Sequence, residues 1–199
     1  MASDVTPSLL AVGAKLAAER GASPAWQEAD AENLPFATGS FDVVVSCVGV
    51  MFAPHHRATA DELIRVARPG GTVGLINWTP EGFIGQLFAT MKPFVTSPPG
   101  AQPAPRWGTP SYLAELFGDR VTDVSVRRAN VRIEAFASGA EFRDYFKTNY
   151  GPTINAYRAV DPSRVADLDR ALADLGDRGL SDGVMEWEYL LYTARTTSR

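Results

Sequence analysis

The sequence predicts an α/β fold with a doubly wound, mostly parallel sheet and an antiparallel strand towards the end of the chain. Residues 41–46 form a continuous run rich in β-branched side chains, which is typical of a parallel strand covered on both faces. Residues 57–68 then carry apolar residues at helical spacing, and 72–77 form a second buried strand. This strand–helix–strand order implies right-handed parallel crossovers, which define the doubly wound architecture.

The chain before residue 41 continues the alternation of helix and strand. Thr6 and Pro7 are residues that start helices, and Gly21 is one that ends them. We therefore expect a helix here with one buried face, formed by Leu9, Leu10, Gly13, Leu16 and Ala17. A short strand is expected at 25–29, and the turn Pro69-Gly70-Gly71 is expected to end the helix at 57–68.

The second half of the chain is expected to form further helices and strands that are more exposed to solvent than the earlier strands. Helices are expected at 82–90 and at 111–117. A third helix is expected to start at Ser138, which forms a capping box with Glu141, and a fourth to start at Asp161-Pro162. The last of these has an apolar face made of Val165, Leu168, Leu172 and Leu175. Residues 131–135 alternate apolar and charged, so this strand is expected to be antiparallel, and 184–193 form the last strand. The Pro-rich stretch 93–105 is either a lid over a substrate or a rigid surface loop.

The composition excludes several classes of function. A chain of 199 residues has room for one ordinary domain, and its net charge of -4 provides no basic field for nucleic acid or an anionic membrane surface. One cysteine and two adjacent histidines exclude an intramolecular disulfide and argue against a metal site. We find neither a membrane-spanning apolar run nor a signal peptide at the start. We therefore expect a soluble, cytoplasmic protein that acts on a small molecule.

Polar residues follow three of the expected strands, where open parallel sheets bind ligands. Asp4 and Asp30 come after the first two strands, and Cys47 comes after the third. One carboxylate can accept both hydroxyls of a ribose and the next can accept an exocyclic amine, which together describe a nucleoside pocket. Singly, Asp4 is equally well a helix N-terminal residue, Asp30 an ordinary loop residue and Cys47 a core residue.

Four segments, in this order and spacing, resemble a known family. They are Asp4-Val5-Thr6-Pro7, then 30–36 (DAENLPF), 40–46 (SFDVVVS) and 62–71 (ELIRVARPGG). The sequence resembles a class I S-adenosylmethionine-dependent methyltransferase of the ubiquinone/menaquinone-biosynthesis type, also called methyltransferase type 11. The resemblance implies a Rossmann-like sheet in one domain, 1–199. Residues 1–78 would be its cofactor-binding half, and 79–199 would supply acceptor-side helices, the Pro-rich loop and the terminal strands.

The resemblance also implies roles for individual residues. Asp4 would bind the ribose hydroxyls of S-adenosylmethionine, and Val5 would pack on the adenine. Asp30 would meet the adenine edge by its side chain and Ala31 by its backbone amide. Cys47 would lie beneath the cofactor near its methionine end. Leu34-Pro35-Phe36 and Pro69-Gly70-Gly71 are interpreted as structural turns without chemistry.

The sequence departs from the family at its start. The family begins with a central strand and a Gly-rich loop ahead of the ribose carboxylate, whereas Asp4 is nearly the first residue here. Without that strand, two unpaired strand edges and an apolar surface would be exposed, and copies of the chain would associate through these edges. The expected function is methyl transfer to a small organic acceptor. The alternative is a truncated, non-catalytic methyltransferase-like protein that has lost cofactor binding.

The chemistry of the expected reaction asks little of the protein beyond positioning. A general base is needed only if the acceptor loses a proton, and His55 and His56 are the candidates, with a solvated loop pair as the competing interpretation. A nicotinamide-dependent oxidoreductase is a weaker third interpretation, because that fold shares the ribose carboxylate but also has a Gly-rich fingerprint. Which acceptor is used does not follow from the sequence.

Overall fold

The computed structural model describes residues 1–96 and 99–197, which form two compact units. Unit 1 comprises Met1–Leu75, Ser111–Val126 and Tyr192–Arg199, and unit 2 comprises Ile76–Pro110 and Arg127–Leu191. The strands are β1 (Ala2–Asp4), β2 (Trp26–Glu28), β3 (Phe41–Cys47), β4 (Ala67–Trp78), β5 (Val121–Ile133) and β6 (Met185–Thr196). The α-helices are α1 (Pro7–Glu19), α2 (His56–Val66), α3 (Phe83–Met91), α4 (Pro110–Phe117), α5 (Gly139–Asn149), α6 (Gly151–Ala159) and α7 (Val165–Gly179).

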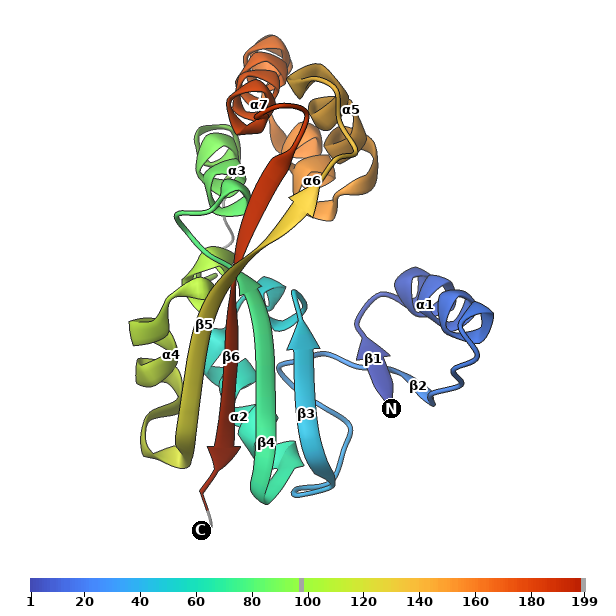
Figure 1. The fold of residues 1–199 in the computed structure, drawn as a ribbon, viewed down its shortest axis with the longest axis vertical. Coiled ribbons are helices and arrows are strands. Elements are labelled where there is room, and N and C mark those ends of the chain that lie inside the picture. The colour runs from blue at the N-terminus through green and yellow to red at the C-terminus, as the bar shows by residue number, and fades with distance from the viewer. Residues whose placement is uncertain (97–98, 198–199) are drawn as a thin grey trace. The chain divides into compact units, whose positions relative to one another are not determined.

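The strands form two sheets (Figure 1). β1 and β2 pair in parallel, with Ala2 opposite Trp26 and Asp4 opposite Glu28. The second sheet has the order β3-β4-β6-β5, and the arrow of β6 points opposite to that of β3. The expected α/β fold with a mixed, Rossmann-like sheet is confirmed.

The division into two sheets confirms the expected gap. β1 ends one sheet and β3 ends the other, so each presents an edge without a neighbouring strand in the described part of the chain. Val43 and Val45 of β3 have 57% and 73% of their surface exposed. An apolar surface therefore lies along the edge of β3.

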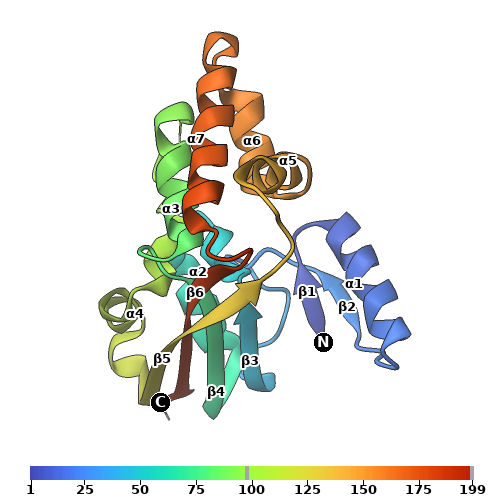
Figure 2. The same ribbon diagram turned by 45° about the horizontal axis from the view of Figure 1, so that its top comes forward.

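Two expectations about burial are wrong, and both concern the surroundings of this gap. The helix expected at 6–21 forms as α1, but every one of its residues is at least partly exposed, because α1 packs on the small β1–β2 sheet (Figures 1 and 2). The run at 41–46 forms β3, but it is an end strand and not a strand covered on both faces. Sequence pattern identified both elements but not what covers them.

Elsewhere in unit 1, α2 supplies the buried face that its spacing predicts. Ala60, Leu63 and Val66 are almost completely buried, as are Val73 and Leu75 of β4. The helix was expected to end at Pro69-Gly70-Gly71, but it ends earlier, at Val66. The backbone becomes extended at its C-cap, Ala67, where β4 begins.

Unit 2 has a closed apolar core between α3, α5, α6 and α7, which group together in both views (Figures 1 and 2). At the start of α5, Ser138 Oγ accepts from the backbone N–H of Glu141 at 3.2 Å, as the capping box predicts, while the Glu141 carboxylate accepts from the N–H of Ala137, one residue before Ser138, at 2.8 Å. In the Pro-rich stretch, Lys92–Phe94 and Ala104–Gly108 form short 3-10 helices, and Pro98 lies outside the described residues. Whether the Pro-rich stretch 93–105 acts as a lid or as a rigid surface loop stays a prediction.

The described residues show neither a membrane-spanning helix nor a metal-binding cluster. None of their helices is both long and apolar enough to cross a membrane. They also contain no group of three His, Cys, Asp or Glu residues arranged to hold a metal ion.

Candidate functional site

A cleft of about 410 Å³ lies in unit 1, within the range typical of small-molecule sites. Its walls come from the end of β1, the loop after β2, the exposed edge of β3, the turn that follows β3, and α2, which contributes Leu63 and Val66. The lining residues in the first two groups are Ser3, Asp4, Val5, Ala29, Asp30, Ala31, Leu34 and Phe36. Asp4 and Asp30 are the charged side chains among the described residues that line the cleft.

Asp4 stands at the carboxyl end of β1, as expected. Its Oδ1 accepts a hydrogen bond from the backbone N–H of Thr6 at 2.8 Å, which supports the start of α1. The carboxylate therefore takes the helix N-terminal role and faces the cleft as well. One oxygen serves the backbone, and Oδ2 is left to accept from a ligand, as judged over the described residues.

Asp30 and Ala31 open the loop after β2. Asp30 Oδ1 accepts from the backbone N–H of Glu32 at 2.9 Å, and its backbone C=O accepts from Asn33 at 3.0 Å. The Asp30 side chain is exposed and Ala31 is half-buried, and both line the cleft together with Asp4 and Val5. Four of the five expected cofactor residues are thus brought to one cleft.

Cys47 is the fifth expected residue, and it is placed differently. It is the last residue of β3, is exposed, and lies outside the cleft wall as defined by the described residues. Its neighbour Ser46 does line the cleft, and its Oγ accepts from the backbone N–H of Val50 at 3.0 Å. The turn between them holds Val48 at a φ of 54°, an uncommon conformation for a β-branched residue that is often found near functional sites.

The two histidines have different surroundings. His55 is exposed; its Nδ1 lies 2.8 Å from Glu32 Oε2, and its backbone N–H donates to Glu32 Oε1 at 2.6 Å. His56 is completely buried, with its Nδ1 2.9 Å from the hydroxyl of Tyr112. Both lie outside the set of described cleft-lining residues, so a role in catalysis stays a prediction for each.

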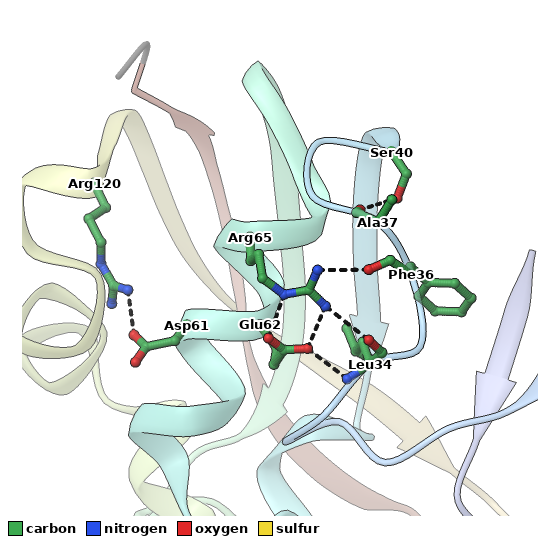
Figure 3. Close-up of polar contacts among 8 residues, drawn as sticks. All are labelled: Leu34, Phe36, Ala37, Ser40, Asp61, Glu62, Arg65 and Arg120. Atoms are coloured by element: carbon green, nitrogen blue, oxygen red, sulfur yellow. Dashed lines mark hydrogen bonds and ion pairs between the residues drawn. The ribbon is translucent and has the colours of Figure 1, made fainter.

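The loop after β2 is held by α2 through two residues that the sequence analysis did not single out (Figure 3). Glu62 Oε2 accepts from the backbone N–H of Leu34 at 2.6 Å, and Arg65 donates to the carbonyls of Leu34 and Phe36 at 2.9 and 2.7 Å. Glu62 and Arg65 also bind each other through two short hydrogen bonds. The hydrogen bond with Arg65 is the main cause of the lowered pKa of Glu62.

With the geometry described, comparisons with known proteins place the chain. Residues 1–75 match a family model described as a methyltransferase domain. Two uncharacterized proteins of Mycobacterium tuberculosis are 50% and 48% identical over 98% of this chain and 72% of their own length. The ubiquinone/menaquinone biosynthesis C-methyltransferase of Bartonella quintana is 40% identical over 70 residues, which are 34% of this chain and 27% of that protein.

The chain belongs to the class I methyltransferase family. Solved structures agree at the level of the fold. The YcgJ protein of Bacillus subtilis matches with a TM-score of 0.60 at 17% identity, covering 99% of this chain and 82% of that one. A SAM-dependent methyltransferase of Methanosarcina mazei matches with a TM-score of 0.54 at 13% identity, covering 99% and 81%. In the part of the chain that the structure describes, no strand pairs with β3 on the side away from β4.

The residues that the sequence analysis missed lie in two of the segments that carry the family resemblance, 30–36 and 62–71. Leu34 and Phe36 were interpreted as parts of a turn, yet both line the cleft. Glu62 and Arg65 belong to the segment 62–71, and their spacing of three places both on one side of a helix. That spacing signals an ion pair, but it does not show that the pair reaches across to a loop some 28 residues earlier in the chain.

Proposed function

We propose that this protein is an S-adenosylmethionine-dependent methyltransferase that acts on a small organic acceptor. The observation that carries the proposal is the meeting of Asp4 and Asp30 on one cleft at the carboxyl ends of β1 and β2. Ligands of open α/β sheets bind at this position. The methyltransferase name of the Bartonella relative and the family model support the reaction class.

The residues present fit the nucleoside part of this cofactor. Since Oδ1 of each carboxylate accepts from a backbone N–H, we assign Oδ2 of Asp4 to the ribose hydroxyls and Oδ2 of Asp30 to an exocyclic amine, with Val5, Leu34 and Phe36 as an apolar wall for the base. The other described side chains that line the cleft are uncharged. Binding is therefore expected to rest mainly on the nucleoside end.

The cofactor supplies an activated methyl group, and the protein contributes position and electrostatics. Asp4 and Asp30 orient the nucleoside, and the walls of the cleft exclude water from its base. If the acceptor must lose a proton, His55 is the more accessible of the two candidate bases, since His56 is completely buried. We assign the acceptor side to residues 79–199 and place the enzyme in the cytoplasm, in keeping with its single cysteine.

Calorimetric titration with S-adenosylhomocysteine, the demethylated product, tests the proposal on the whole chain. We expect saturable binding that Asp4→Ala and Asp30→Ala each weaken by about tenfold or more, the effect of losing a charge-assisted hydrogen bond. Glu28→Ala is the matched control, because Glu28 is the exposed register partner of Asp4 and lies outside the described cleft wall. Equal loss of affinity in all three variants would contradict the proposal.

The alternative function is a methyltransferase-like protein without cofactor binding or catalysis. The edges of β1 and β3 favour it, because they leave one side of the cleft apolar and open, with Val43 and Val45 exposed. A chain that circular dichroism shows to be folded, but that binds neither S-adenosylmethionine nor S-adenosylhomocysteine, would establish this alternative.

A further inference from the structure

The loop between β2 and β3 forms much of the proposed cofactor site, yet it has little regular structure of its own. Asp30, Ala31, Leu34 and Phe36 all line the cleft. The loop contains one isolated bridge, between Asp30 and Asn33, and otherwise consists of turns and bends. Its internal hydrogen bonds lie near its two ends, at Asp30 and at Ala37–Ser40, so the segment between them depends on groups outside the loop.

The backbone of this loop is bound from outside by the Glu62–Arg65 pair of α2 (Figure 3). The Leu34 N–H and C=O are both satisfied, one by the Glu62 carboxylate and the other by the Arg65 guanidinium. A further donor of Arg65 reaches the Phe36 carbonyl at 2.7 Å. The two residues thus serve the loop as a neighbouring strand would, and the side chains of Leu34 and Phe36 remain in the cleft wall.

The geometry and the charges of Glu62 and Arg65 stabilise their contacts with the loop. The Glu62 and Arg65 side chains are only 15% and 32% exposed, and they face each other in a fork with distances of 2.6 and 2.7 Å. The guanidinium lowers the pKa of Glu62, so the carboxylate is charged at neutral pH. Charge-assisted and bidentate hydrogen bonds are stronger and more directional than neutral ones. Glu32, which binds His55 at the start of α2, ties the beginning of the loop to the same helix.

We propose that Glu62 and Arg65 are positioning residues of the cofactor site: they fix the backbone of Leu34 and Phe36, and through it the wall that receives the base. This inference rests on the proposed function. Neither residue lines the cleft as described, so each acts through the loop and without touching the ligand. The loop's geometry, and with it the affinity for a nucleoside, therefore depends on an ion pair behind the site.

The test compares variants of this pair with a second ion pair on the same helix. Glu62→Ala removes the acceptor for Leu34, whereas Glu62→Gln keeps an oxygen in nearly the same place. Asp61→Asn is the matched control, because among the described residues Asp61 binds Arg120, which follows α4, and not the loop (Figure 3). We measure adenosine and S-adenosylhomocysteine affinity by calorimetry, and hydrogen exchange of the amides at 32–38 by mass spectrometry.

We expect Glu62→Ala to lower the affinity for both ligands by about tenfold, and Glu62→Gln to lower it by about threefold. Both variants should show faster exchange at 32–38, and Asp61→Asn should leave the affinity unchanged. General destabilisation would speed exchange across the whole chain, whereas loss of the Leu34 contact should speed it at 32–38 alone. Unchanged exchange at 32–38 in Glu62→Ala overturns the inference. If the unmodified chain binds no ligand, the proposed function fails, and exchange still shows whether the pair holds the loop.

Discussion

Helices α1 and α7 have the same spacing of apolar residues in sequence, but these residues are exposed in α1 and buried in α7. Leu168, Leu172 and Leu175 of α7 are at most 1% exposed, whereas Leu9, Val12 and Leu16 of α1 are 57%, 54% and 45% exposed. In both helices these apolar residues recur at intervals of three or four. α7 packs against α3 and α5, while α1 packs on the two short strands β1 and β2.

The difference shows what apolar periodicity determines and what it leaves open. Spacing selects the secondary structure and the face that prefers burial. Whether that face is buried depends on a partner element, which local sequence does not specify. Around β1, β3 and α1 the described residues supply few partners, so three apolar surfaces stay exposed in the same unit. Four predictions test this comparison.

The largest expected effect separates the two helices directly. Leu172→Ala should lower the free energy of unfolding by about 3 kcal/mol, because it leaves a cavity in the closed core of unit 2. Leu9→Ala, on the exposed face of α1, should change it by less than about 0.5 kcal/mol. Urea unfolding followed by far-ultraviolet circular dichroism measures both. A cost at Leu9 equal to that at Leu172 would mean that the α1 face is covered in solution.

Two helical glycines provide a second contrast. A Cβ at Gly176 in α7 would lie 2.6 Å from the Gly139 Cα, so Gly176→Ala should cost about 2 kcal/mol through overpacking. A Cβ at Gly13 in α1 would meet the outer ring atoms of the partly exposed Trp26 at 2.8 Å, and that side chain can move aside. Gly13→Ala should therefore be neutral or stabilising by up to about 1 kcal/mol, from helix propensity. Thermal unfolding of both variants checks the opposite signs.

The site could be predicted from sequence to the extent that it depends on strand ends. Asp4 and Asp30 follow strands, and parallel strands bring their carboxyl ends to one edge, so their meeting on the cleft follows from topology. Cys47 follows a strand as well, but it is exposed outside the described cleft wall. The cleft wall along β3 includes Val43, Val44, Val45 and Ser46 and ends one residue before Cys47, a limit that the strand pattern alone does not specify.

Contacts distant in sequence were beyond prediction. The Glu62–Arg65 pair is visible as a spacing of three, but its hold on Leu34 depends on how α2 docks beside the loop. Likewise, a β-branched run such as 41–46 has the same pattern in a central strand and in an end strand, since its neighbours decide its burial. The gap beside β3 was anticipated only from the family resemblance.

A third prediction contrasts the two end strands of the four-stranded sheet. β5 carries Asp123, Arg127, Arg128 and Arg132, and charges of this kind protect an edge from pairing, whereas β3 carries only Asp42. We therefore expect any self-association to proceed through β3. Val45→Lys should weaken it by about tenfold, and Val124→Lys on β5 should leave it nearly unchanged. Sedimentation velocity over a concentration series distinguishes them, and a strictly monomeric unmodified chain would refute self-association.

The smallest effect concerns acid and compares one carboxylate from each unit. The pKa of Glu62 lies below its ordinary value of 4.5, chiefly through its hydrogen bond with Arg65. Burial raises the pKa of Asp169, but hydrogen bonds from Tyr157 and Lys147 outweigh it, so the net shift from 3.8 is downward. Both groups therefore stabilise the folded state above their unfolded pKa values, and this stability is lost as the pH falls through the lower folded values.

Unfolding free energies measured from pH 7 to about pH 3 should fall less steeply in Glu62→Gln and in Asp169→Asn than in the unmodified chain. The two losses should differ in where they act. Protonation of Glu62 weakens its hydrogen bond with the Leu34 amide and should speed hydrogen exchange at 32–38, whereas protonation of Asp169 weakens its contacts with α5 and α6 and leaves the loop unaffected. Equal acid sensitivity of the loop in the unmodified chain and in Glu62→Gln would show that the loop is held by other groups.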